Sequence, residues 1–126
     1  GSRAGLMLSA RLAALPQAEA TQAGRVREDL QTWVSVRPGD AGAWQALARV
    51  SERLGQPLAS LRAQAEAQAA LGDLAGAVDR LRAGQRLSRS SGAVESMEGV
   101  VIESRLKALE QQRRAELERE RRGEDD

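Results

Sequence analysis

Glycine and proline break the chain at nearly regular intervals, and this spacing constrains the fold more than any other feature of the sequence. The breaks fall at Pro16, Pro38, Gly55, Gly72 and Gly92. Each interval has room for one helix of roughly 14 residues, a common helix length in globular proteins. The connections left over are about two to four residues long, and links this short force consecutive helices to lie antiparallel. The breaks therefore predict a series of short antiparallel helices.

The composition favours helices that pack through small side chains. Aromatic residues make up only 2% of the chain, and Ala, Leu and Val carry most of the apolar fraction. Sheets usually draw on β-branched and aromatic residues, whereas Ala and Leu favour helix. A length of 126 residues is enough for one domain with one modest core. We therefore expect an all-α domain of five to six helices.

Within each interval the apolar residues recur at the spacing of one helix face. Residues 4–15 form an apolar run that Arg11 interrupts, which favours a packed helix over a secretory signal. Residues 18–36 and the three helices that follow carry the expected core. That core comprises Ala23, Val26, Leu30, Trp33 and Val34, then Trp44, Leu47, Ala48, Ser51 and Leu54, then Leu58, Leu61, Ala65 and Leu71, and last Leu74, Ala77, Val78, Leu81 and Gly84. We interpret both tryptophans as core anchors between successive helices.

A longer last helix is expected after the polar break at residues 89–96. Its apolar positions are Val94, Met97, Val101, Ile102, Leu106 and Leu109. Beyond Leu109 the apolar face nearly ends, because QQRRAELERERRGEDD contains a single leucine. We expect residues 3–109 to form the domain, residues 110–126 to form a charged helical extension or a disordered tail, and Gly1 and Ser2 to be left over from cloning. A short coiled-coil partner for the last helix stays open, although fewer than about three heptads support it.

Several classes of function are disfavoured by what the chain lacks. The sequence has no His and no Cys, which removes thiol nucleophiles, imidazole bases and most zinc sites. Glu95, Glu98 and Glu103 are spaced onto different sides of a helix, so they do not form a catalytic pair. With 19 basic and 18 acidic residues the net charge is +1, and no stretch approaches the roughly 18 apolar residues of a membrane span. We expect no enzymatic activity, no cofactor, no nucleic acid partner and no membrane insertion.

The turns and the residues around them resemble the tetratricopeptide repeat, a helix-turn-helix unit with a period of roughly 34 residues. Gly55 and Gly72 lie 17 residues apart, which is half of that period. In PGDAGAWQALARVSERLG, the repeat's Trp, Leu, small and turn-glycine positions hold Trp44, Leu47, Ala48 and Gly55. In LGDLAGAVDRL and the residues after it, the turn, the two small positions and the large apolar position hold Gly72, Ala77, Gly84 and Leu81. This resemblance implies a right-handed array of stacked helices.

Small residues at Ala77 and Gly84 would let adjacent helix backbones approach, so that stacking takes the place of side-chain bulk. The pattern departs from the repeat at Ser51, where a Tyr is usual, and at Gln64, where a large apolar residue is expected. The helix over residues 58–71 must also serve two units, as the second helix of one and the first helix of the next. A generic α-solenoid is therefore an alternative interpretation.

A more specific resemblance covers roughly residues 28–113. Its motifs, in chain order, are Ala65 with Glu66, Gly72 with Asp73, Ala77 and Val78 with Leu81, and Arg105 and Leu106 with Leu109. The set is similar to the C-terminal helical-repeat domain of bacterial periplasmic zinc metalloproteases that carry an HExxH motif.

This resemblance implies a non-catalytic domain in the periplasm that recruits a protein or peptide. In the family, the partners are misassembled outer-membrane proteins or their assembly machinery, and the domain packs beside its own upstream protease domain. The zinc ligands belong to that separate domain, and none of them has a counterpart here because the chain contains no His. A stand-alone adaptor and an oligomerisation module that uses the last helix are the alternative functions.

In repeats of this kind, the first helix of each unit lines a concave groove. The spacing i, i+4, i+7 places Gln45, Arg49 and Glu52 opposite the core of their helix, and on the next helix Arg62 and Glu66 share one face. The candidate groove residues are Gln45, Arg49, Glu52, Arg53, Arg62 and Glu66. They could bind an extended peptide through charge-assisted hydrogen bonds, or they could form an ordinary solvated face.

Overall fold

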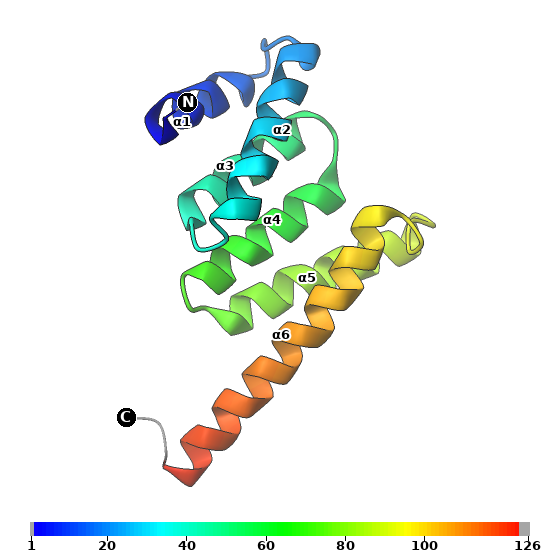
Figure 1. Cartoon of the computed structure of the whole chain (residues 1–126). Helices are drawn as coiled ribbons and strands as arrows, with labels where there is room; N and C mark the ends of the chain where they lie inside the picture. Colours follow the sequence, from blue (N-terminus) through cyan, green and yellow to red (C-terminus); the bar gives the residue numbers. More distant parts are fainter. Residues whose placement is uncertain (1, 124–126) are drawn as a thin grey trace.

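The computed structural model describes residues 2–123, and this range contains six α-helices and no strand. The helices are α1 (Arg3–Ala13), α2 (Ala20–Val36), α3 (Ala41–Arg53), α4 (Pro57–Ala70), α5 (Leu74–Ser90) and α6 (Met97–Arg122). Short turns connect them, and α6 reaches beyond the other helices toward the C-terminus (Figure 1). The prediction of an all-α fold is confirmed for this range. The expectations for Gly1 and residues 124–126 lie outside it.

Local chemistry places the ends of the helices at the predicted breaks. Asp40 and Asp73 each accept a hydrogen bond from the backbone N–H three residues later, and so cap the N-termini of α3 and α5. Ser2 caps α1 in the same way by accepting from the N–H of Gly5, at 3.1 Å. Gly55 and Gly72 follow α3 and α4 with φ of 72° and 85°, a conformation that other residues rarely adopt.

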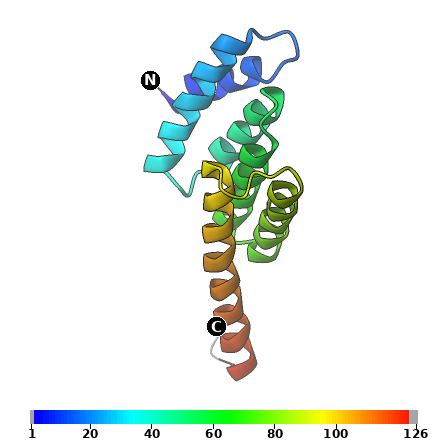
Figure 2. The same ribbon diagram turned by 90° about the vertical axis from the view of Figure 1, so that its right-hand side faces the viewer.

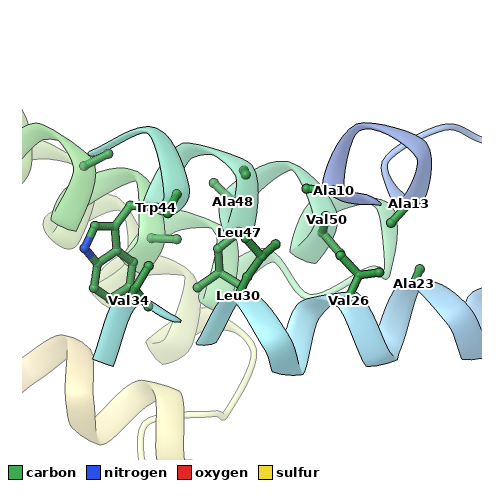
Figure 3. Packing of buried hydrophobic residues seen from close by; sticks show 14 residues of the cluster. Ala10, Ala13, Ala23, Val26, Leu30, Val34, Trp44, Leu47, Ala48 and Val50 are labelled. Carbon is green, nitrogen blue, oxygen red and sulfur yellow. The ribbon is translucent and has the colours of Figure 1, made fainter. Parts of the chain in front are cut away.

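The first half of the chain packs around one apolar cluster, which α1, α2, α3 and one face of α4 build. Figure 3 shows Leu30 of α2 and Leu47 of α3 pointing toward each other, and Val34 beside the ring of Trp44. Trp44 is only 5% exposed, and Leu30 is fully buried. The two predicted core stripes of α2 and α3 therefore meet each other.

A second apolar cluster lies between α4, α5 and α6. Val78 and Leu81 of α5 are buried there against Ile102 and Leu106 of α6. Polar pairs border this cluster, including Arg82 with Glu110 at 2.8 Å and Gln85 with Glu103 at 3.0 Å.

The helix α4 belongs to both clusters. Ala63 and Ala67 lie in the first, whereas Ala65 lies in the second with Leu58 and Ala69 packed against it. Alanines on both sides of one helix allow close neighbours on both sides. The helix that was expected to serve two repeat units thus contributes to two apolar clusters, and the repeat arrangement itself stays a prediction.

Packing between helices that are not consecutive divides the described residues into two groups. The backbone of α1 lies close to that of α3, and the backbone of α4 lies close to that of α6, but the backbones of α2 and α4, and those of α3 and α5, do not approach each other. Two three-helix groups, α1–α3 and α4–α6, are thus joined along α3 and α4. Figure 2 shows this junction from the side, with α2 above the start of α6.

Three residues predicted to be buried are exposed instead. Leu71 is 62% exposed because it lies at the C-cap of α4, where the helix ends and the chain turns outward. Val94 is 39% exposed in the turn before α6, and Met97 is 84% exposed at the first position of α6. Periodicity assigned these residues to a helix face, but Leu71 and Met97 lie at helix ends and Val94 lies in the turn between two helices.

The helix α6 continues well past its last buried residue, Leu109. Its charged part is supported by pairs along the helix, in which Glu118 accepts from Arg121 and Arg122 one turn later. Leu117, the one leucine of this segment, is 49% exposed.

Candidate protein-binding surfaces

A groove with a volume of about 580 Å³ runs between α3 and α4. Its lining consists of Gln45, Ala48, Arg49, Glu52, Pro57, Ser60, Leu61 and Gln64. We call it the α3/α4 groove. The side chains from α3 come from one stripe at i, i+4, i+7, so helix periodicity alone brings three of the predicted site residues together.

The polar groups of this groove are available to a partner. Gln45, Arg49 and Glu52 are exposed, and none of their side chains makes a hydrogen bond or ion pair within residues 2–123. Ala48 of α3 and Ser60 of α4 also line the groove, and both are small and buried. Arg49 and Glu52 place a cation and a carboxylate on its rim. An extended peptide backbone offers the donors and acceptors that such a rim can bind.

The other three predicted groove residues have different positions and contacts. Arg53 donates to the backbone carbonyls of Leu15 (3.0 Å) and Ala18, and so holds the connection between α1 and α2. Arg62 lies over the ring of Trp44, with 5.5 Å between its guanidinium carbon and the ring centroid. Neither Arg62 nor Glu66 lines the α3/α4 groove.

Glu66 is only 9% exposed and forms the strongest polar link between α4 and α6. Its two carboxylate oxygens accept from Nε and Nη2 of Arg105, at 2.7 and 2.8 Å. Bidentate geometry of this kind fixes both side chains. The carboxylate that the sequence offered to a ligand is therefore already bound within the chain.

Asp40 organises the turn between α2 and α3, where both tryptophans are held. Its carboxylate caps α3, accepts from Trp33 Nε1 at 2.9 Å, and pairs with Arg3 of α1 at 2.8 and 2.9 Å. The Arg3 guanidinium, followed by the Trp33 and Ala43 N–H groups, holds the pKa of Asp40 well below its usual range despite partial burial. Trp44 Nε1 donates to the carbonyl of Pro38 at 2.9 Å, so each indole has a polar partner in this turn.

The small residues predicted to permit close packing lie at the α5 interface. Ala77 is fully buried and Leu81 is 1% exposed. At Gly84 an added Cβ would lie 3.0 Å from Cδ1 of Ile102, tighter than ordinary van der Waals contact. The backbone of α5 therefore approaches the side chains of α6 directly at this position.

A second concave surface, which the sequence did not reveal, lies between α2 and the start of α6. We call it the α2/α6 cleft. Its volume is about 490 Å³, and its lining consists of Arg27, Gln56, Pro57, Leu58, Ala59, Leu87, Ser91, Ala93, Ser96, Met97 and Glu98. The ends of α4, α5 and α6 that contribute to it lie together on the right of Figure 1. The sequence offers one signal for this cleft. Arg27 precedes buried Leu30 by three residues and Glu98 precedes buried Ile102 by four, so each charged side chain lies on the same helix face as a buried residue.

Within residues 2–123 no group of three or more acidic, His or Cys side chains could hold a metal ion. In the same range, no helix combines the length and the apolar character needed to cross a membrane.

Comparisons with protein-family models, with curated proteins and with solved structures found no match for this chain. The class defined by the fold is accordingly a broad one, an all-α chain of two joined three-helix groups.

Proposed function

We propose that this chain is a non-catalytic protein-binding domain whose α3/α4 groove takes an extended peptide segment of a partner. The observation that carries the proposal is the row of Gln45, Arg49 and Glu52 side chains, unpaired within residues 2–123, beside an apolar lining that includes Ala48, Pro57 and Leu61. Both signs of charge next to this lining favour a peptide that carries charged as well as apolar side chains.

The helical architecture that presents the groove is, in this proposal, a variant of the right-handed tetratricopeptide-like array. Trp44 and Leu47 as core anchors of α3, and the sharing of α4 between two clusters, support it. The backbones of α2 and α4, and those of α3 and α5, do not approach each other, which makes this array less regular than tandem repeats, in which every unit stacks on the next in the same way.

We further propose that the parent protein is a periplasmic zinc metalloprotease and that this chain recruits its substrates or partners. The support is the ordered motif set, including Ala65 with Glu66 and Gly72 with Asp73. Reading the complete gene tests this part, because a parent without an upstream HExxH motif would leave a stand-alone adaptor as the function of the same groove.

Charge reversal at Arg49 tests the groove itself. Proteins from a periplasmic extract are captured on the immobilised chain, and a peptide from a captured partner is titrated by fluorescence anisotropy. Because Arg49→Glu puts two acidic groups on the rim, we expect the peptide to bind about tenfold more weakly, which corresponds to roughly 1.4 kcal/mol. The matched control is Arg86→Glu, since Arg86 is an exposed arginine of α5 outside the groove. Equal affinity of wild type and Arg49→Glu would reject the groove.

A further inference from the structure

The α2/α6 cleft combines an apolar floor with two opposite charges that are not paired with each other. Leu58 of α4, Leu87 of α5 and Met97 of α6 supply apolar lining, and Met97 is 84% exposed. A flexible, exposed methionine is a common feature of surfaces that bind other proteins. Arg27 from α2 and Glu98 from α6 supply the charges.

Each of these two charged groups has a polar atom that is hidden from solvent. Nε of Arg27 and Oε2 of Glu98 expose less than 1 Å² and have no hydrogen-bond partner in the described part of the chain. Buried polar atoms normally have partners, because leaving one unpaired costs free energy. The two groups do not form an ion pair with each other. These two atoms are themselves closed to a ligand, but neither side chain makes any hydrogen bond or ion pair within residues 2–123, so the remaining guanidinium N–H groups of Arg27 and Oε1 of Glu98 have no partner in that range.

The start of α4 adds a further site for negative charge beside Arg27. Its N-cap residue, Gln56, makes no side-chain capping bond, and Pro57 has no N–H. The N–H groups of Leu58 and Ala59, which line the cleft, therefore have no capping side chain. The positive end of the α4 dipole and the Arg27 guanidinium favour an acidic group on the same side of the cleft.

We propose that the α2/α6 cleft is a second docking site, which binds a segment of a partner protein carrying an apolar side chain between an acidic and a basic residue. The apolar side chain packs on Leu58, Leu87 and Met97. The acidic group binds Arg27, and the basic group binds Glu98. The charge pattern of the cleft determines this occupant, since an all-acidic or an all-basic segment would meet one repulsive group. The site shares only Pro57 with the α3/α4 groove and does not depend on the function proposed for that groove.

The test uses a displayed library of random twelve-residue peptides, selected against the whole chain. We expect the enriched peptides to carry an apolar residue between one acidic and one basic residue. Titration of a selected peptide should shift the backbone amide NMR signals of residues 56–59 and 96–98. Arg27→Glu and Glu98→Lys should each weaken this peptide about tenfold, and selection against Arg27→Glu should enrich peptides with two basic residues.

Two control variants distinguish binding in the cleft from a general effect of charge and from a folding defect. Arg25→Glu, at an exposed arginine of α2 outside the cleft, should leave the peptide affinity unchanged. Two controls address folding defects. Arg27→Gln removes the charge without reversing it, and circular dichroism should show unchanged helix content in every variant. Arg49→Glu should not weaken these peptides, so the failure of one site can be told from the failure of the other.

Three results would overturn the proposal. One is a selection that enriches no peptide with this charge pattern, and another is a set of peptides whose affinity does not depend on Arg27 or Glu98. The third is a concentration-dependent dimer that Arg27→Glu dissociates, measured by light scattering, because a second copy of this chain would then be the occupant.

Discussion

Replacement of Asp40 tests how the chain joins its first three helices. This one carboxylate caps α3, accepts from Trp33 and pairs with Arg3 of α1. Asp40→Ala removes all of these interactions. Asp40→Asn has a single oxygen, which can still cap α3, but it places an amide N–H where Oδ2 accepts from Trp33, and it also loses the charge. The comparison of the two variants therefore separates the cap from the Trp33 bond and the charge.

The expected loss follows from the individual bonds. Removal of an N-cap costs about 1 kcal/mol. The Trp33 bond to a charged acceptor that is 15% exposed contributes about 1.5 kcal/mol. The Arg3 pair adds little, because 49% of that side chain is exposed. We expect Asp40→Ala to lower the free energy of unfolding by about 2.5 kcal/mol, or the melting temperature by roughly 10 °C, and Asp40→Asn to lower it by about 1.5 kcal/mol, since the amide keeps the cap but not the acceptor for Trp33.

The dependence on pH distinguishes the charge from the cap. Because the pKa of Asp40 is lower in the folded chain than in the unfolded chain, the unfolded chain binds more protons as the solution becomes acidic. The contribution of the charge is complete above the unfolded value of about 3.9 and is lost as pH falls below it. The stability difference between wild type and Asp40→Asn should thus be constant from about pH 7 to 5 and shrink toward pH 3.

Urea unfolding followed by circular dichroism at several pH values measures these differences. A matched control is Asp73→Asn, since Asp73 caps α5 and, within residues 2–123, has no partner from another helix. A difference between wild type and Asp40→Asn that stays constant down to pH 3 would refute the assignment to the carboxylate charge. A loss for Asp40→Ala no larger than for an ordinary cap would refute the role of Trp33.

Two further predictions concern the interior. Gly99→Ala should destabilise the chain by about 2 kcal/mol, because the new Cβ would lie 2.3 Å from the carbonyl oxygen of Ala93. Gly24→Ala should stabilise it by about 0.5 to 1 kcal/mol, because the new Cβ would have no atom within 4 Å and Ala favours helix. Thermal melts of the two variants measure this difference, and equal shifts in melting temperature would contradict it. For the ion pair between α4 and α6, Arg105→Ala should lower the free energy of unfolding more than Glu66→Gln does, because removal of Arg105, whose side chain is 37% exposed, leaves unpaired a Glu66 side chain that is only 11% exposed. A double-mutant cycle measured by urea unfolding should give a coupling energy of about 1 kcal/mol. A larger loss for Glu66→Gln than for Arg105→Ala would contradict this reasoning.

The positions of the helices were predictable because their ends depend on local chemistry. Asp40 and Asp73 cap the helices that follow them, and Gly55 and Gly72 adopt the left-handed conformation that ends the helices before them. These effects involve residues a few positions apart, so the sequence contains all the information they need. Burial at helix ends was predicted less well, as Met97 shows, because it depends on where the neighbouring helix stops.

The candidate groove was predictable on α3 but not on α4. On α3 the neighbouring helices leave one stripe uncovered, and the predicted stripe with Gln45 and Arg49 is that exposed one. The helix α4 has neighbours on two sides, and the face opposite one neighbour can point toward the other. Glu66 illustrates this, because it contacts Arg105 of α6, which lies 39 residues later in the sequence. Most apolar positions of α4 are alanines, and they occur on both faces of the helix, so the sequence pattern does not distinguish one buried face from the other.

The position of α4 explains why two binding surfaces can exist on so small a chain. Its N-terminal turn lies between them: Pro57 lines both the α3/α4 groove and the α2/α6 cleft, whereas Leu61 and Gln64 belong only to the groove and Leu58 and Ala59 only to the cleft. A helix with a single buried face could not border two grooves in this way. Both apolar clusters contain side chains of α4, so this helix is packed on two sides. Its first turn borders both surfaces because Pro57 is exposed and Leu58 and Ala59 are only half-buried.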